Sequence, residues 1–157
     1  MQLHQLEVRP RTVLLAGLAG GSAEILWVAA YAGLTPASGF NVARGVTETV
    51  FPGAGELALA AMAGIAIHML LSIALAWLLA KPLLQYAVGR FGPTALLPAA
   101  LTALAGIWAI NFLVVLPVLN PAFVALMPMP VTLASKLLFG AAMAIVLQRD
   151  MLRAVRL

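Results

Sequence analysis

Hydrophobic residues dominate four long stretches of the chain, and polar residues gather in the shorter segments between them. The stretches lie near residues 12–34, 56–80, 93–116 and 131–148. Their lengths fall within the roughly 17–25 residues that a helix needs to cross a bilayer. Because the bilayer core holds no water, each stretch must satisfy its own backbone hydrogen bonds, which favours α-helix. The pattern predicts an all-α integral membrane protein, with one four-helix bundle as the single domain of residues 1–157.

The composition supports this prediction and excludes several classes of protein. Hydrophobic residues make up 64% of the chain and charged residues 9%, whereas a soluble domain carries about 25% charged residues. The net charge of +4 comes from bases beside the hydrophobic stretches, and no basic patch is interleaved with aromatic residues. No nucleic-acid partner is therefore expected. The chain has no cysteine, which excludes disulfides, thiolate catalysis and cysteine-ligated metals.

Lysine and arginine positions predict the direction of the four helices. If the helices alternate in direction, Arg44 is the only base in a loop on one side of the membrane, and Lys136 lies within the fourth stretch. Bases concentrate in cytoplasmic segments, so both termini are predicted to be cytoplasmic. The first stretch is longer than a signal-peptide core and contains Glu24, so we expect it to remain in the protein. Seven bases share the cytoplasmic side in this arrangement: Arg9, Arg11, Lys81, Arg90, Arg149, Arg153 and Arg156.

The two loops on the outer side are predicted to differ. Ser38 is placed to cap a short amphipathic helix over Asn41–Phe51, and such a helix lies along a membrane surface. An irregular loop is the alternative. The second loop, Pro117–Pro130, holds four prolines and no charge, and is expected to enter the membrane interface. In the amphipathic segment, one face carries Val42, Val46 and Val50, and the other carries Asn41, Arg44, Thr47 and Glu48.

Two internal similarities indicate a tandem pair of helical hairpins. Trp27–Tyr31 is similar to Trp108–Phe112, and Ala66–Leu71 is similar to Ala134–Phe139. A repeat of this kind places both hairpins in the same membrane orientation. The alternative is a chance likeness between apolar helices of similar composition.

Four polar side chains within the predicted helices form a candidate intramembrane cluster: Glu24, His68, Asn111 and Lys136. A polar or ionisable group at membrane depth costs free energy, which makes each a candidate functional residue. Small residues at helical spacing indicate the faces that pack against other helices. Because these faces include the four polar groups, we expect the polar groups to converge inside the bundle. The predicted helix-packing residues are Gly17, Gly20, Gly21, Gly64, Ser72 and Gly140.

Each polar side chain also has a structural interpretation. Lys136 is near a helix end, so its long stem can extend to the membrane surface. Asn111 and a neutral His68 can each hydrogen-bond a neighbouring helix. An unpaired Glu24 would be protonated, because desolvation disfavours the carboxylate. A Glu24–Lys136 pair would keep both groups charged, and a Glu24–His68 bond could carry a proton.

Motifs of familiar catalytic sites are missing from the sequence. It has no Gly-x-Ser-x-Gly turn, no phosphate-binding loop and no dinucleotide fingerprint. Two histidines, His4 and His68, do not supply an ordinary three-ligand zinc site. We therefore expect no enzymatic activity and no cofactor, with metal or haem binding through His68 and Met69 as an alternative.

One segment carries a resemblance to a known group of proteins. The run Ala43–Gly53, with the flanking helices that contain Trp27 and His68, resembles a group of small bacterial proteins with four transmembrane helices. Most members are uncharacterised, and the name "sodium:proline symporter" is sometimes attached to them. The resemblance covers most of the chain and implies a location in the bacterial inner membrane, but it carries no pattern of site residues.

The sequence favours a non-enzymatic accessory or assembly component of a larger membrane complex. Its expected partners are the lipid bilayer and other membrane-protein subunits or further copies of itself. The alternative is a small oligomeric transporter, or a proton- or cation-conducting protein, that uses Glu24, His68 and Lys136.

Overall fold

The computed structural model describes residues 9–155, and this part of the chain is helical with no strand. Four helical segments are long and apolar enough to cross a membrane, and they correspond to the four predicted stretches. Their length and composition suggest a multi-pass membrane protein. Arg156, which entered the prediction of orientation, lies outside the described residues. The four segments are Pro10–Leu34, Ala60–Phe91, Pro93–Leu119 and Met129–Arg153.

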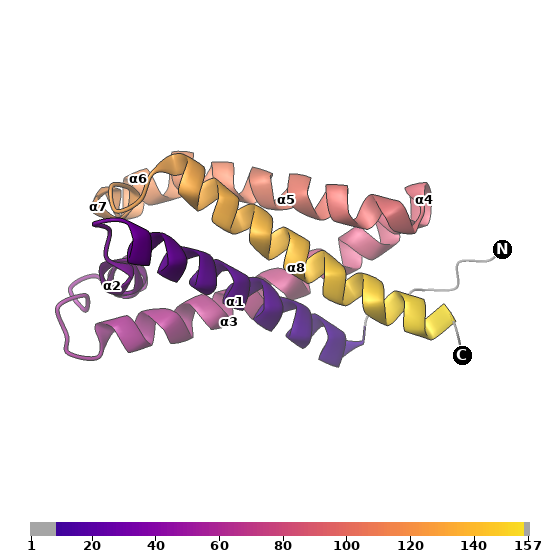
Figure 1. Cartoon of the computed structure of the whole chain (residues 1–157), viewed down its shortest axis with the longest axis horizontal. Helices are drawn as coiled ribbons and strands as arrows, with labels where there is room; N and C mark the ends of the chain where they lie inside the picture. The colour runs from indigo at the N-terminus through magenta and orange to yellow at the C-terminus, as the bar shows by residue number, and fades with distance from the viewer. Residues whose placement is uncertain (1–8, 156–157) are drawn as a thin grey trace.

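The long helices lie side by side in the order α3, α1, α8, α5 (Figure 1). Helix α1 (Pro10–Leu34) packs against both α3 (Ala60–Pro82) and α8 (Met129–Val155). Helix α8 also packs against α5 (Leu96–Ile110). Both ends of the described chain lie at one end of the molecule, called here the termini end (Figure 1). Helix α2 (Gly39–Val50) lies at the opposite end, called the loop end. Fully buried core residues come from all four helices and include Ala16, Ala76, Leu104 and Phe139.

The second long helix differs from its prediction at both ends. It begins at Ala60 rather than at residue 56, and it does not end before Lys81. Instead, α3 continues into the π-helix η1 (Leu83–Val88) and the short α4 (Gly89–Phe91). The chain then turns at Gly92, whose φ is +85°. Pro82 has no N–H to donate, and the wider π-turn that follows it lets the helix continue past this gap in its hydrogen bonding.

The third and fourth long helices extend slightly beyond their predicted ranges. The third begins with the 3₁₀ turn η2 (Pro93–Ala95) and, after α5, continues through the π-helix η3 (Asn111–Val115) and α6 (Leu116–Leu119). The loop that follows contains α7 (Pro121–Val124). Asn120 joins this loop to α2, because its Nδ2 donates to Thr49 Oγ1 at 3.0 Å and its Oδ1 accepts from the amide of Phe123 at 3.0 Å.

Helix α2 (Gly39–Val50) confirms the predicted short helix and its cap, since Ser38 Oγ accepts from the amide of Asn41 at 3.2 Å. Thr47, from the predicted polar face of this helix, is buried and donates to the Ala60 carbonyl at 2.6 Å. Gly64 allows the approach, because a Cβ there would overlap the backbone carbonyl of Ala43. Helix α2 therefore packs across the start of α3.

Charged side chains of α2 also hold the segment that follows it. The Glu48 carboxylate accepts from the amides of Gly53 at 2.8 Å and Gly55 at 2.7 Å. These two bonds lower the pKa of Glu48 from its ordinary value. Arg44 donates to the Gly55 carbonyl at 2.7 Å and pairs with Glu56 at 3.0 Å. The segment between α2 and α3 is thereby fixed against α2.

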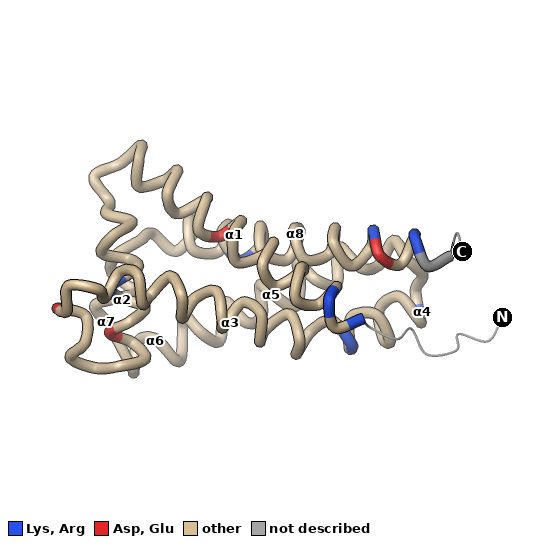
Figure 2. The backbone as a smooth tube through the Cα atoms, turned by 90° about the horizontal axis from the view of Figure 1, so that it is seen from below, with Lys and Arg blue, Asp and Glu red and all other residues tan. Residues whose placement is uncertain are grey.

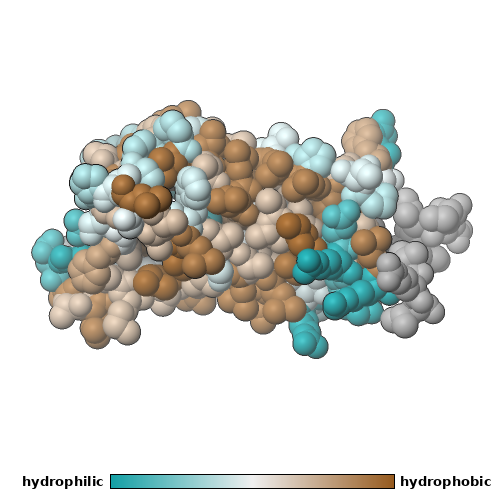
Figure 3. Space-filling view, viewed as in Figure 1, coloured by the Kyte–Doolittle hydropathy of each residue, from teal (hydrophilic) through white to brown (hydrophobic). Residues whose placement is uncertain are grey.

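Charged residues collect at the two ends of the molecule. Figure 2 shows Lys and Arg positions gathered near the termini end, and both acidic and basic positions at the loop end. Glu24 lies on α1, and Asp150 lies near the end of α8. On the face shown in Figure 3, a hydrophobic band separates the more polar ends. Large apolar side chains are exposed along the long helices, among them Leu26, Leu70, Trp77, Leu97 and Ile110. An apolar band with charged ends is the pattern that a lipid-facing surface requires.

Candidate functional site

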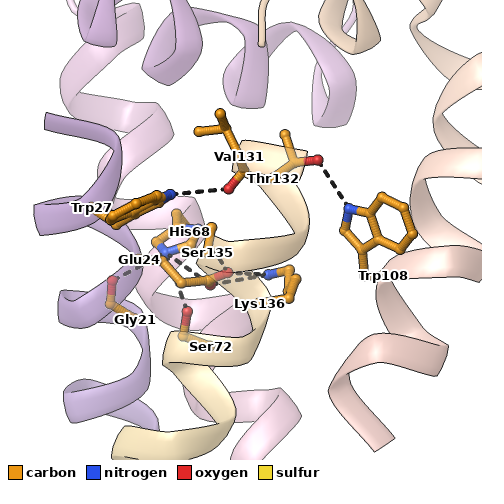
Figure 4. A network of polar contacts seen from close by, with 10 residues as sticks. All are labelled: Gly21, Glu24, Trp27, His68, Ser72, Trp108, Val131, Thr132, Ser135 and Lys136. Atoms are coloured by element: carbon orange, nitrogen blue, oxygen red, sulfur yellow. Dashed lines mark hydrogen bonds and ion pairs between the residues drawn. The ribbon is translucent and has the colours of Figure 1, made fainter. Parts of the chain in front are cut away.

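Glu24 lies on α1 and is only 3% exposed. Helix α8 supplies two of its partners: Ser135 Oγ donates to Glu24 Oε1 at 3.1 Å, and Lys136 Nζ lies 2.7 Å from the same oxygen. Lys136 Nζ also donates to Glu24 Oε2 at 3.0 Å. Figure 4 shows these contacts between α1 and α8. The carboxylate is therefore paired and hydrogen-bonded, as a buried charge must be.

The Lys136 side chain points inward and does not extend to the surface. Its side chain is 18% exposed, and its ammonium is held by Glu24. Lys136 Nζ also lies 5.8 Å from the centroid of the Phe139 ring, within the range of a cation–π contact. Of the alternatives for Lys136, the ion pair with Glu24 is confirmed.

His68 brings α3 to the same site. Its Nε2 lies 3.6 Å from Glu24 Oε2, 3.4 Å from the Gly21 carbonyl and 3.5 Å from Ser72 Oγ. All three contacts involve one ring nitrogen, so its protonation decides whether it donates to Gly21 and Glu24 or accepts from Ser72. The His68 side chain is 23% exposed. The site thus holds one carboxylate, one ammonium and one imidazole, from three different helices.

Asn111 does not join this cluster. It lies at the start of η3 on the third long helix and is half-buried. Among the described residues, its side chain forms no hydrogen bond with Glu24, His68 or Lys136. The prediction that four polar groups converge is therefore met by three of them.

The predicted packing residues lie at the helix contacts that bring the three groups together. A Cβ at Gly21 would meet Ser72 Oγ at 2.7 Å, and one at Gly20 would meet the Phe139 ring at 2.8 Å. Gly20 and Gly21 are adjacent residues of α1 and lie about one helical turn before Glu24. Further along the interface of α1 with α3, Gly17 faces the backbone of Ile73, while Gly140 faces the carbonyl of Ala100 where α8 packs against α5. The Cβ-free positions let α3 and α8 approach α1 closely enough for short side-chain contacts.

Sequence reasoning missed two indole contacts beside the cluster. Trp27 Nε1 donates to the Val131 carbonyl at 3.0 Å, and Trp108 Nε1 donates to Thr132 Oγ1 at 2.9 Å. Adjacent residues near the start of α8 thus receive one indole from α1 and one from α5 (Figure 4). The available signal was the paired Trp27 and Trp108 segments of the proposed repeat. Ser135 was also missed, and its only signal was a hydroxyl next to Lys136 in an apolar helix.

The metal alternative receives little support from the geometry. Among residues 9–155, no group of three His, Asp or Glu side chains is arranged to hold a metal ion. His68 Nε2 faces Glu24, while Met69 Sδ packs where a Cβ on Gly21 would lie, 3.0 Å away. His68 Nε2 also contacts the Gly21 carbonyl at 3.4 Å, so both side chains lie beside Gly21 on α1.

Comparison with protein-family models, curated proteins and solved structures finds no match to this chain. Its function must therefore follow from the chemistry of its own residues. That chemistry is a charge-compensated ion pair with an adjacent imidazole and two hydroxyls, buried between three helices.

Proposed function

We propose that this chain is a multi-pass protein of the bacterial inner membrane with both termini in the cytoplasm. The four apolar helices and their exposed apolar side chains support membrane insertion. The basic residues at the termini end support the orientation, because bases favour the cytoplasmic side. The resemblance of the Ala43–Gly53 segment to small bacterial four-helix proteins supports the bacterial location.

Single cysteines test this orientation, since the chain has none of its own. Ala122 on α7 and Thr94 in η2 are exposed at opposite ends of the third long helix. In intact spheroplasts, a membrane-impermeant maleimide should label Ala122→Cys, whereas Thr94→Cys should react only after permeabilisation. The reverse pattern contradicts the orientation, and equal labelling of both contradicts insertion.

Within the membrane, the chain acts as a non-enzymatic accessory or assembly component that associates with other membrane-protein subunits or with further copies of itself. The direct contact of Lys136 Nζ with both oxygens of Glu24 carries this proposal. Glu24 and Lys136 neutralise each other's charge, and their contact holds α1 against α8. These intramembrane charges therefore have a structural role. The bonded carboxylate is then not free to bind a transported ion.

The outer face of α5 supports the association. Gly106 is exposed, and a Cβ built on it would meet no atom within 4 Å. Thr102, one turn earlier, is exposed as well. Small residues four positions apart allow a second transmembrane helix to approach closely. This face is therefore suited to contact with another helix in the bilayer.

Crosslinking in native membranes, followed by intact mass measurement, tests the association. The wild-type chain should give a crosslinked product of defined mass, and Gly106→Leu should reduce it. Gly33→Leu is the matched control, because Gly33 is also an exposed glycine in a long helix with open space around it. Recovery of the wild-type chain only as a monomer would contradict the proposal.

A second candidate function is proton or cation conduction through an oligomer, using Glu24, His68 and Lys136. The observation that favours it is the 3.6 Å distance between His68 Nε2 and Glu24 Oε2, with Ser72 Oγ 3.5 Å beyond. Proteoliposomes loaded with a pH-sensitive dye distinguish the two functions. Flux above that of empty liposomes, lost in both Glu24→Gln and His68→Ala, would replace the accessory role with conduction.

A further inference from the structure

A groove lies at the termini end, between the end of the second long helix and the start of α5. Its volume is about 890 Å³. Two features of the sequence create it. The π-helix η1 follows Pro82 and displaces the helix path, while α5 presents only small side chains at Ala99 and Ala103. The groove is far from the Glu24 cluster and shares no residue with it.

The two ends of the groove differ in chemistry. Leu79 and Ala103 line the part farthest from the turn at Gly92, Arg90 lines the polar part beside that turn, and Gln85 and Ala99 lie between them. Leu79 and Arg90 are separated by 11 helical residues, which corresponds to roughly 16 Å along the axis. Exposed aromatic rings of Tyr86 and Phe91 stand beside the polar part. Aromatic and basic side chains of this kind mark the membrane–water interface.

Arg90, the base that lines the groove, has no ion-pair partner within residues 9–155. Within residues 9–155, the acidic side chains in ion pairs are engaged elsewhere: Asp150 with Arg9, Glu56 with Arg44, and Glu24 with Lys136 and His68. Arg90 is exposed and forms none of these pairs. Its guanidinium instead lies 5.7 Å from the centroid of the Phe91 ring. The groove therefore combines apolar lining residues with a guanidinium that forms no ion pair in the part of the chain that the structure describes.

We propose that this groove binds an anionic phospholipid, with an acyl chain along Leu79, Ala99 and Ala103 and the headgroup phosphate on Arg90. A guanidinium donates two parallel hydrogen bonds to a phosphate, and Gln85 offers a further amide donor. The acyl chain covers apolar surface that the helices leave open. The inference rests on the proposed location in the membrane, because a lipid reaches the groove from the bilayer.

Native mass spectrometry of the full chain, released from detergent with phosphatidylglycerol or phosphatidylcholine of equal chain length, tests the site. The wild-type chain should retain phosphatidylglycerol about fivefold more strongly than phosphatidylcholine, the preference that one interfacial base provides. Arg90→Gln should remove that preference, and Arg90→Lys should keep much of it. Arg149→Gln is the matched control, because Arg149 is an exposed base at the same end outside the groove.

A second variant tests the apolar lining without changing charge. Ala99→Leu reduces the volume of the groove and should weaken retention of both lipids. Equal retention of the two lipids by the wild-type chain would overturn the proposal. So would an equal loss in Arg90→Gln and Arg149→Gln, since that result indicates general surface charge. A lipid-free dimer that is lost in Ala99→Leu would overturn the proposal, because it would show that a second copy occupies the groove.

Flotation separates failure of the lipid site from failure of the proposed function. The wild-type chain is first reconstituted with phosphatidylcholine vesicles and extracted with alkaline carbonate. If it does not remain with the vesicles, the proposed membrane location fails. If it remains with them but shows no preference for phosphatidylglycerol, only the lipid site fails.

Discussion

Lys136 Nζ contacts both carboxylate oxygens of Glu24, at 2.7 and 3.0 Å, and joins the middle of α1 to α8 across 112 residues of sequence. Each charge offsets the desolvation of the other only while both are present. Removing one partner therefore leaves an unpaired charge in an apolar interior, whereas removing both leaves none. This asymmetry makes the structural role of the pair measurable.

Glu24→Gln and Lys136→Met should each lower the free energy of unfolding by about 3–5 kcal/mol, the usual cost of breaking a buried pair from one side. The double variant should recover much of that loss. Each of the three variants is placed in detergent micelles and titrated with a denaturing detergent. Circular dichroism then follows the loss of helix and gives the free energy of unfolding. Glu56→Gln is the control, because its carboxylate is 95% exposed and its pairing with Arg44 should matter little. Single variants as stable as the wild type would contradict a structural pair.

The contact between α2 and α3 depends on Gly64. A Cβ there would overlap the Ala43 carbonyl, so Gly64→Ala must push the two helices apart and break the Thr47–Ala60 bond. We expect a loss of about 1–3 kcal/mol, as for an overpacked core. Gly106→Ala meets no atom within 4 Å and should be neutral or stabilise by up to about 1 kcal/mol. Thermal unfolding of both variants checks this, and equal effects would show that Gly64 is not a contact.

The sequence predicts the four long helices because their hydrophobic stretches are long and carry few charges. It also predicts the close helix contacts, since glycines such as Gly17, Gly21 and Gly140 have little other use within apolar helices. The limit of such reasoning is visible at Pro82. A proline normally ends a helix, but here a π-helix follows and the helix continues to Phe91. The hydrogen-bond register after a proline depends on tertiary packing, which periodicity does not report.

The sequence predicts only part of the candidate site, again because tertiary packing decides where its side chains point. Counting residues places Glu24 and His68 near mid-membrane and Lys136 closer to the outer surface, but it cannot decide whether Lys136 turns inward or extends to that surface. That choice follows from the close approach of α8 to α1, which Gly20 permits at Phe139. Asn111 stays apart because the cluster forms where α1 meets α3 and α8, whereas Asn111 lies on the third long helix, whose α5 packs against α8.

The indoles of Trp27 and Trp108 anchor the start of α8 from both sides. Replacing either with Phe keeps most of the ring volume and removes one hydrogen bond, to the Val131 carbonyl or to Thr132 Oγ1. Each variant should lose about 0.5–1.5 kcal/mol of stability. Trp77→Phe is the control, because Trp77 is half exposed and donates no hydrogen bond among the described residues. Losses in Trp27→Phe and Trp108→Phe no larger than in this control would contradict anchoring.

The segment after α2 should respond to acid through Glu48. Amides of Gly53 and Gly55 donate to its carboxylate and lower its pKa in the folded chain. A lowered folded pKa contributes stability that is complete above the ordinary pKa of glutamate, about 4.3, and is lost as pH falls through the lowered value. Hydrogen exchange of the two amides, compared with Glu48→Gln, should show extra protection in the wild type at neutral pH that disappears in acid. Protection that persists equally in Glu48→Gln at neutral pH would exclude the carboxylate as the group that orders this segment.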